Sequence, residues 1–252
     1  MKLKIATWNI SSGISNDYND ETFFDQGKSS EINETFLNEI IRIVKNEELD
    51  IICFQEIITT ERINYINKIM KFTNLKYECH FELSECHLVD NTDCGISILS
   101  KFPIIEIEKL MFTNPKLSKT TKTGATYYTY DKGCLLAKIM IGDTYVNVIT
   151  NHGFPFRRFD SKPQEHLNIF NELKQFISRY ENVIATGDFN AENVTSFMPD
   201  IEHKVKSLFD EVTTTDGKKY DNILIDKKYN MIDKKIIKSM SDHYLCISTI
   251  EI

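Results

Sequence analysis

The sequence predicts a mixed α/β fold in which two stacked β-sheets carry helices on their outer faces. Strand-like and helical segments alternate as βαβα over residues 2–70, a run of strands follows, and one helix precedes the last strands. Apolar residues make up 41% of the 252, enough for a sizeable core. Because no internal repeat or low-complexity linker stands out, we expect one domain over residues 1–252.

The first half supplies the βαβα pattern. Residues 2–9 alternate in polarity and predict a strand, whereas the Ser-, Gly-, Asn- and Asp-rich residues 11–31 predict a long loop. Apolar side chains then recur at helical spacing over about 33–47. Leu49–Phe54 is a nearly continuous apolar strand, and apolar side chains within 63–70 mark a second helix.

From residue 77 the helical period disappears and short strands dominate. The candidates are Tyr77–Leu83, Gly95–Ser100, Ile104–Met111, Thr126–Tyr130, Cys134–Ile141 and Thr144–Thr150. Gly142-Asp143 predicts a tight hairpin between the last two, and Pro163 is a suitable start for a helix through Ile177. The final strands are expected near 182–187, 220–226, 229–237 and 243–250.

The net charge of −7 argues against an overall basic surface for long duplex DNA. A nucleic-acid contact would therefore need a local patch. Two lysine clusters could each form such a basic patch or could simply be solvated surface. One is Lys227, Lys228, Lys234, Lys235 and Lys238, and the other is Lys116, Lys119 and Lys122. The acidic excess suits a site that concentrates a divalent cation.

The N-terminus lacks the apolar core of a secretory signal, and no run reaches the length of a membrane span. A cytoplasmic protein is expected, with a monomer as the default. Cys53, Cys134 and Cys246 lie in apolar runs and predict small core side chains. The segment Cys79–His87 repeats Cys-His without the close cysteine pairs of zinc sites, so reduced thiols on a hairpin are favoured over zinc or a disulfide.

Five polar clusters each lie at the end of an apolar run. They are Asn9, Glu56, Asn151-His152, Gly187-Asp188-Phe189-Asn190 and Ser241-Asp242-His243. A strand buries its apolar residues and delivers the residue that follows to the rim of a sheet. We therefore expect these clusters to meet in one oxygen-rich site for a metal and a phosphate.

The donor types in these clusters indicate which metal is expected. Glu56, Asp188 and Asp242 offer carboxylates, while Asn9 and Asn190 offer amide oxygens. Hard oxygen ligands favour Mg²⁺ or Mn²⁺ over zinc.

Histidines beside the clusters are candidates for handling protons and phosphate. His152 and His243 occupy such positions, whereas the other four are interpreted as structural or exposed: His80, His87, His166 and His203. Asp221 opens a strand shortly before His243. A carboxylate beside an imidazole fixes its tautomer and favours its protonated form, which can donate to a phosphate oxygen.

Six motifs together carry a resemblance to a known family. They are Thr7-Trp8-Asn9, Gln55-Glu56, Asn151-His152, Gly187-Asp188-Phe189-Asn190, Tyr220-Asp221-Asn222-Ile223-Leu224 and Ser241-Asp242-His243. In this order they resemble the endonuclease/exonuclease/phosphatase superfamily, the deoxyribonuclease I-like phosphoesterases. The resemblance spans residue 3 to about 250, and Gly95–Pro103 resembles the central strand of the superfamily.

The resemblance implies a four-layer α/β-sandwich, two packed mixed β-sheets flanked by helices, with the site at one rim. It implies a metal held by Glu56 with help from Asn9 and Asp242.

The resemblance also implies catalytic roles. Asp188 would orient or deprotonate the attacking water, and Asn190 would hold the water or the phosphate. His152 and His243 would hold and neutralise the phosphate, with Asp221 supporting His243.

The segment Gly153–Phe159 departs from the pattern of many relatives. Phe154, Phe156, Arg157 and Arg158 could stack a base and pair with phosphate, or could form a hydrophobic plug and a solvent-facing arginine pair. The acidic 11–31 loop is a candidate wall of the site.

The expected activity is divalent-metal-dependent hydrolysis of a phosphodiester in a nucleic acid or a nucleotide-like ester. A phosphomonoesterase, or an enzyme directed at phospholipids or inositol phosphates, is the alternative in the same class. A non-catalytic binding module would be expected to lack Glu56, Asp188 or His243, and all three are present.

Overall fold

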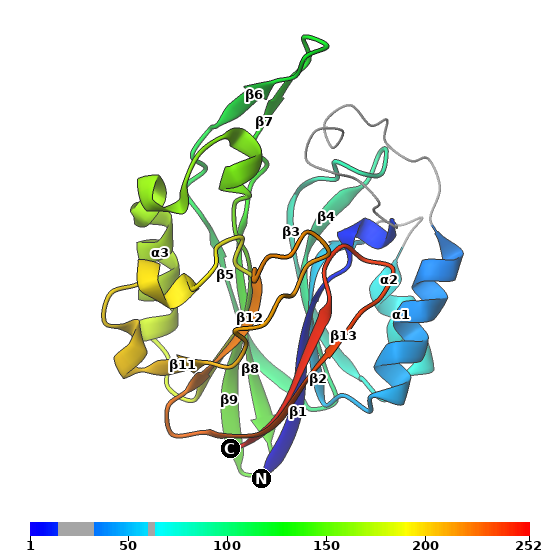
Figure 1. Ribbon diagram of the computed structural model, residues 1–252. Helices are drawn as coiled ribbons and strands as arrows, with labels where there is room; N and C mark the ends of the chain where they lie inside the picture. The colour runs from blue at the N-terminus through cyan, green and yellow to red at the C-terminus, as the bar shows by residue number, and fades with distance from the viewer. Residues whose placement is uncertain (15–32, 60–63) are drawn as a thin grey trace.

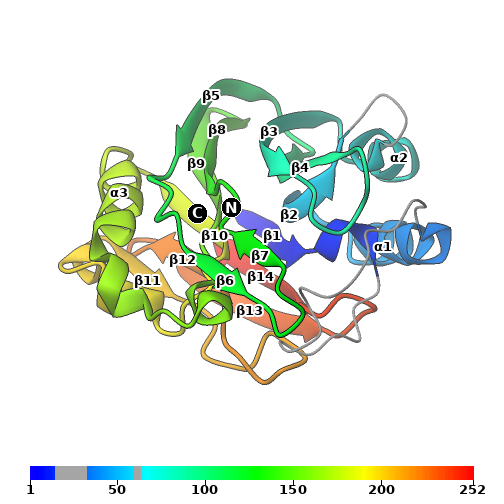
Figure 2. The ribbon, with the colours of Figure 1, turned by 90° about the horizontal axis from the view of Figure 1, so that it is seen from above.

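Two six-stranded mixed sheets stack face to face, and helices cover their outer faces, as Figures 1 and 2 show. The computed structural model describes residues 1–14, 33–59 and 64–252. The layers run α1 and α2, first sheet, second sheet, α3 (Figure 2). The predicted four-layer α/β-sandwich is therefore confirmed.

The first sheet has the strand order β13-β14-β1-β2-β4-β3. Its strands are β13 (Asn230–Ile237), β14 (Leu245–Glu251), β1 (Lys2–Asn9), β2 (Ile51–Ile58), β4 (Asp93–Ser100) and β3 (Tyr77–Glu85). β1 and β2 are parallel, and all other neighbours in this sheet are antiparallel.

The second sheet has the order β11-β12-β10-β9-β8-β5. Its strands are β11 (Val205–Ser207), β12 (Asp221–Asp226), β10 (Val183–Asp188), β9 (Thr144–His152), β8 (Gly133–Ile141) and β5 (Ile104–Met111). β9 and β10 are parallel, and the remaining pairs are antiparallel. A separate hairpin, β6 (Ser118–Thr120) and β7 (Thr126–Tyr128), projects above the second sheet (Figure 1).

The three predicted helices are present, with ends that differ from the prediction by one to four residues. α1 (Glu34–Asn46) is capped by Asn33, whose side chain accepts a hydrogen bond from the Phe36 backbone N–H. α2 is Tyr65–Phe72, and a 3-10 turn from Pro163 leads into α3 (Leu167–Ser178). None of the helices in the described ranges has the length and apolar character needed to cross a bilayer.

Three apolar cores hold the layers together. Leu3, Ile96 and Val148 belong to the core between the sheets. α1 and α2 pack on the first sheet, and α3 packs on the second through Phe170 and Leu173. Burial of these apolar faces is the main force that fixes the sandwich and hence its rim. Cys53, Cys134 and Cys246 lie in these cores as free thiols, as predicted.

Two differences from the sequence prediction concern segments near the site. β2 does not end at Phe54 but continues to Ile58, so Glu56 lies inside the strand rather than after it. Of the predicted 11–31 loop, only residues 11–14 are described, as a 3-10 turn over Ser11–Gly13 and the residue after it. The proposed role of its acidic residues as a wall of the site falls outside the described part of the chain.

Candidate active site

The central strands of both sheets end at the same rim of the sandwich. β1 ends at Asn9, β9 at His152 and β10 at Asp188. Within the second sheet, Asp188 lies opposite both His152 and Asp221. The strand ends thus bring together residues that are far apart in the sequence, as the sequence predicts.

A bulge delivers Glu56 to this rim. The pairing of β2 with β4 shifts between Gln55 and Ile57, and Glu56 has a left-handed backbone with φ of 52°. Phe54 packs under the helices, so regular alternation would turn Glu56 toward the helices as well. The extra residue re-aims the carboxylate at the pocket.

A glycine allows β9 and β10 to approach closely beside the site. Gly187 has φ of 136°, and a Cβ at this position would lie 2.1 Å from the Asn151 carbonyl oxygen. Glycine has no Cβ and tolerates this backbone conformation. The position immediately before Asp188 therefore requires glycine.

Asn9 links the carboxylates of the two sheets. Its Nδ2 donates to Glu56 Oε1 at 3.2 Å and to Asp188 Oδ2 at 3.1 Å. Its Oδ1 accepts a hydrogen bond from the Ser11 backbone N–H at 3.0 Å. Burial tends to raise the pKa of Glu56. His87, His152, Lys132 and the hydrogen bond from Asn9 Nδ2 together hold this pKa well below its usual range.

His243 and Asp221 form a buried pair. Asp221 is fully buried, and its Oδ2 lies 2.8 Å from Nδ1 of His243. His243 Nε2 lies 3.7 Å from Asp188 Oδ2. Burial alone would lower the pKa of His243, but Asp221 and Asp188 raise it well above its ordinary value. The two carboxylates therefore favour the protonated form of the imidazole.

Asp188 occupies the centre of the site. Its Oδ1 accepts a hydrogen bond from the Asn190 backbone N–H at 2.8 Å, and its Oδ2 accepts one from Asn190 Nδ2 at 3.1 Å. Burial raises the pKa of Asp188 to about 6, although the nearby His243 opposes the rise. A carboxylate with this pKa is mostly ionised at neutral pH and can still accept a proton.

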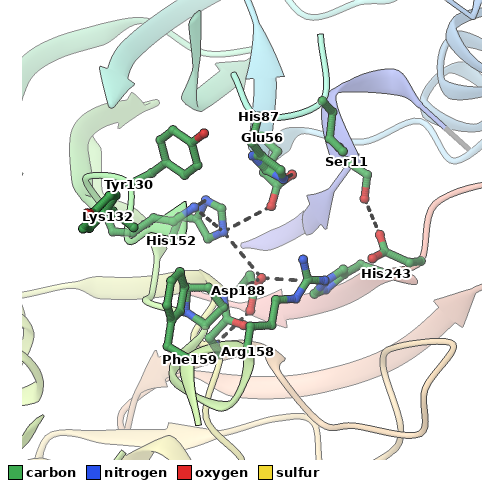
Figure 3. Close-up of a pocket in the computed structure, with 15 residues that line it drawn as sticks. Ser11, Glu56, His87, Tyr130, Lys132, His152, Arg158, Phe159, Asp188 and His243 are labelled. Atoms are coloured by element: carbon green, nitrogen blue, oxygen red, sulfur yellow. Dashed lines mark hydrogen bonds and ion pairs between the residues drawn. The ribbon is translucent and has the colours of Figure 1, made fainter. Parts of the chain in front are cut away.

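His152 faces both sheets and one lysine. Its Nε2 lies 3.4 Å from Glu56 Oε1 and 3.7 Å from Asp188 Oδ2, and these side chains point toward one another in Figure 3. Lys132 Nζ lies 3.1 Å from each ring nitrogen. Burial and Lys132 lower the pKa of His152 well below its ordinary value. Burial and the neighbouring lysine thus both disfavour the protonated form of His152.

Most of these side chains line one open pocket. Its volume is about 630 Å³ when the solvent at its mouth is included. Its lining residues are Ser11, Glu56, His87, Leu88, Tyr128, Tyr130, Lys132, His152, Pro155, Arg158, Phe159, Asp188, Asn190, Asp242 and His243. Asn9 and Asp221 lie just behind this surface, where each holds a lining side chain. Asp242 accepts a hydrogen bond from the Ser11 hydroxyl.

Phe154 and Phe156 do not face the pocket. Each is 1% exposed and packs in the core under α3, where Phe156 also stacks on His166 with ring centroids 4.5 Å apart. The base-stacking interpretation is wrong for both, because an apolar segment next to a helix is buried more favourably than exposed. Arg157 pairs with Asp216 at 2.8 Å outside the pocket, and Arg158 lines it.

Several lining residues were not predicted. His87 was interpreted as structural or exposed, but it lines the pocket with Nε2 3.9 Å from Glu56 Oε2, and its ring lies 5.7 Å from that of Tyr130. Burial lowers the pKa of His87 to about 4, even though Glu56 opposes this. Lys132 lies two residues before the apolar run 134–141, so the same strand-end rule could have identified it.

The donor set fits a hard divalent cation. The carboxylates of Glu56, Asp188 and Asp242 lie around the pocket, and no cysteine is among its lining residues in the described part of the chain. Oxygen donors of this kind suit Mg²⁺ or Mn²⁺. Asn9 directs its amide nitrogen at two of these carboxylates and so orders the anionic ligands.

Comparisons with known proteins agree with this fold. A sequence profile described as the Endonuclease/Exonuclease/phosphatase family matches residues 6–202. A search of curated proteins found no match. Among solved structures, an endonuclease/exonuclease/phosphatase from Beutenbergia cavernae superposes with a TM-score of 0.72 at 11% identity, covering 100% of this chain and 72% of that one.

Two further similar structures belong to proteins with different names and substrates. D. rerio TDP2 complexed with a single-strand DNA product has a TM-score of 0.62 at 15% identity, covering 100% of this chain and 99% of that one. A mannosyl-6-phosphatase from Bacteroides thetaiotaomicron has a TM-score of 0.61 at 13% identity, covering 99% and 100%. At these identities the likeness shows the shared fold.

Proposed function

This chain belongs to the Endonuclease/Exonuclease/phosphatase family, and from that premise we propose that it hydrolyses phosphodiesters with the help of Mg²⁺ or Mn²⁺. One observation carries the proposal. Glu56, Asp188 and His243 come from three separate segments and line a single pocket whose side chains supply anionic oxygens, a proton acceptor and a proton donor. Hydrolysis of a phosphate ester needs these three functions together.

Asp188 is the proposed base. Its carboxylate takes a proton from the water that attacks phosphorus, while the bond from phosphorus to the leaving oxygen breaks. Asn190 supports this role because its backbone N–H and its amide both donate to Asp188 and fix the carboxylate in one orientation.

Cationic groups on either side would stabilise the phosphate. Protonated His243 can donate from Nε2 to a non-bridging oxygen, since its Nδ1 faces Asp221. Lys132 supplies a second positive charge beside His152, and its side chain is only 7% exposed. A buried cation acts more strongly on a bound phosphate than an exposed one.

Glu56 and Asp242, with Asn9, are the residues proposed to hold the divalent ion. The ion would act as a Lewis acid on the phosphate ester. Lys132 and the hydrogen bond from Asn9, which help to keep Glu56 ionised, also keep its carboxylate available as a ligand.

The experiment is hydrolysis of bis(4-nitrophenyl) phosphate and of 4-nitrophenyl phosphate, each with Mg²⁺, Mn²⁺ or EDTA. We expect metal-dependent hydrolysis of the diester that exceeds hydrolysis of the monoester. Asp188→Asn should abolish this hydrolysis. Asp143→Asn, in the exposed β8–β9 turn, is its matched control and should behave as the wild type. A folded wild-type protein that is inert on both esters with both metals would overturn the proposal.

A phosphomonoesterase is the second candidate. The pocket holds Lys132, Arg158 and a protonated His243, which would also suit a dianionic monoester. The similar structure from Bacteroides thetaiotaomicron is that of a mannosyl-6-phosphatase, an enzyme of this class. The ratio of diester to monoester rates in the same experiment separates the two functions.

A further inference from the structure

The β6–β7 hairpin rises from the rim beside the pocket. We call residues 113–131, which contain both strands, the arm. Figures 1 and 2 show it standing above the sandwich, on the same side as the strand ends that form the site. Tyr128 and Tyr130, at the end of the arm nearest the body, line the pocket.

Hydrogen bonds fix the base of the arm. Asn114 Oδ1 accepts from the Thr129 hydroxyl at 2.7 Å, and Asn114 Nδ2 donates to Asp131 Oδ1 at 2.7 Å. Lys119 pairs with Asp160 at 3.0 Å and ties the arm to the 3-10 turn that carries Arg158. The arm is thus held in a defined position over the pocket.

One face of the arm carries an exposed aromatic ring. Ser118 pairs with Tyr128 and Thr120 with Thr126, so these four side chains share a face of the hairpin. Tyr128 is 64% exposed although it lines the pocket. A tyrosine this exposed adds little to the core, and its ring is available to a ligand in the pocket mouth.

The arm is basic in an acidic protein. It contains Lys116, Lys119 and Lys122 against one acidic residue, Asp131, a net charge of 3 − 1 = +2, whereas the whole chain carries −7. Lys116 and Lys122 are exposed.

The other lysine cluster has a different environment. Lys234 pairs with Glu211 at 2.6 Å and Lys235 with Glu47 at 2.7 Å. No lysine of either cluster lines the pocket, but the arm also carries Tyr128 and Tyr130, which do. The arm lysines therefore form the positively charged cluster that is attached to residues of the pocket.

Resting on the proposed function, we propose that the arm selects single-stranded nucleic acid as the substrate. Tyr128 stacks on an unpaired base next to the scissile phosphodiester, and the arm lysines attract flanking phosphates. Base–aromatic stacking needs an exposed base face, which a duplex hides. An inositol phosphate or a lipid headgroup has no aromatic face for Tyr128 to contact.

The test compares Tyr128→Ala with Tyr128→Phe, which keeps the ring. Binding of a fluorescent oligodeoxythymidine of about ten nucleotides is measured by anisotropy in EDTA, and the same strand paired with oligodeoxyadenosine is the duplex probe. We expect Tyr128→Ala to weaken single-strand binding about tenfold, the loss of one stacked base, and Tyr128→Phe to stay near wild type. Tyr77→Ala, an exposed tyrosine on β3 outside the pocket, is the matched control.

Two further readouts sharpen the test. The wild type should bind the single strand more tightly than the duplex. Lys116→Gln combined with Lys122→Gln should lower the slope of log affinity against log salt by about 1.4, since each phosphate contact on a single strand contributes about 0.7.

The outcomes are distinguishable from failure of the proposed function. A protein that is inert on small diesters but still binds the single strand through Tyr128 would refute the proposed hydrolysis. It would leave the proposal for the arm standing. An active enzyme that prefers duplex, or whose single-strand affinity is equal in wild type and Tyr128→Ala, would overturn the arm proposal. Anionic vesicles or inositol phosphates that displace the oligonucleotide equally well would also overturn it.

Discussion

The two sheets share one strand pattern but deliver different side chains to the pocket. In the first sheet the parallel pair β1 and β2 lies between the antiparallel neighbours β14 and β4. In the second sheet the parallel pair β10 and β9 lies between β12 and β8 in the same way. Asn9 and Asp188 therefore end equivalent strands, and Glu56 and His152 lie on their parallel partners.

The chemistry differs between these equivalent positions. The first sheet contributes Glu56 and, before β14, Asp242, which are oxygen donors suited to a cation. The second contributes Asp188, His152 and, before β8, Lys132, which suit water and phosphate. The comparison teaches that topology sets where strands end, while the residue at each end sets the task. We propose that the first sheet holds the ion and the second supplies the base that takes the proton from water, whereas His243, which precedes β14 of the first sheet, donates to the phosphate.

The largest expected effect is at Asp188. Asp188→Asn keeps the size of the side chain, but it replaces one of the two acceptor oxygens with an amide NH2 and cannot take a proton from water. We expect kcat on bis(4-nitrophenyl) phosphate to fall about a thousandfold at saturating metal. Steady-state kinetics on a variant with a wild-type melting curve checks this. Turnover within tenfold of wild type would remove Asp188 from the role of base.

Glu56 tests the other sheet. Glu56→Gln removes a charged donor, and we expect the affinity for Mn²⁺ measured by calorimetry to fall at least about tenfold. Glu78→Gln, an exposed position on β3, is the matched control. Unchanged affinity in Glu56→Gln would place the ion elsewhere.

Asp221 is a positioning residue on the second sheet that holds His243, which precedes β14 of the first sheet. Asp221→Asn leaves Nδ1 of His243 without its carboxylate partner, and we expect kcat to fall about tenfold to a hundredfold while Mn²⁺ affinity is kept. The Nδ1 proton of His243 should also lose its downfield position in the NMR spectrum of labelled protein. A spectrum identical to wild type would contradict the pairing in the structure.

The smallest effect concerns a histidine outside the site. His80 lies between the hydroxyls of Thr59 and Ser97, at 2.7 and 2.8 Å, and burial lowers its pKa to about 4. Its folded pKa is below the unfolded value of 6.5, so its contribution is complete above pH 6.5 and is lost as pH falls toward 4.

His80→Asn tests this contribution. The wild type should lose on the order of 2 kcal/mol of unfolding free energy from this group between pH 6.5 and 4, and the variant should lose less. Urea denaturation across that range measures the difference. Equal pH dependence in the two proteins would show that His80 is protonated when folded.

Much of the framework followed from local pattern. The alternation in residues 2–9 and the apolar runs before His152 and Asp188 identify strands and their ends, because burial dictates periodicity. The pairing of Asp221 with His243 was also anticipated, and the structure places them 2.8 Å apart.

Other features depend on contacts between distant segments. The bulge at Glu56 arises from pairing with β4, which the residues of β2 alone do not reveal. Phe154 and Phe156 face α3 rather than the pocket, and His87 enters the pocket from the segment between β3 and β4. Such choices are set by tertiary packing, which a local pattern does not contain.

The division of labour between the sheets is tested most directly by measuring Mn²⁺ affinity and kcat together in Glu56→Gln and Asp188→Asn. We predict that Glu56→Gln loses affinity for the ion, and that its turnover recovers in part at high Mn²⁺. Asp188→Asn should bind Mn²⁺ within a few-fold of wild type and stay inactive at every concentration. The reverse pattern, or equal loss of both properties in both variants, would contradict the account.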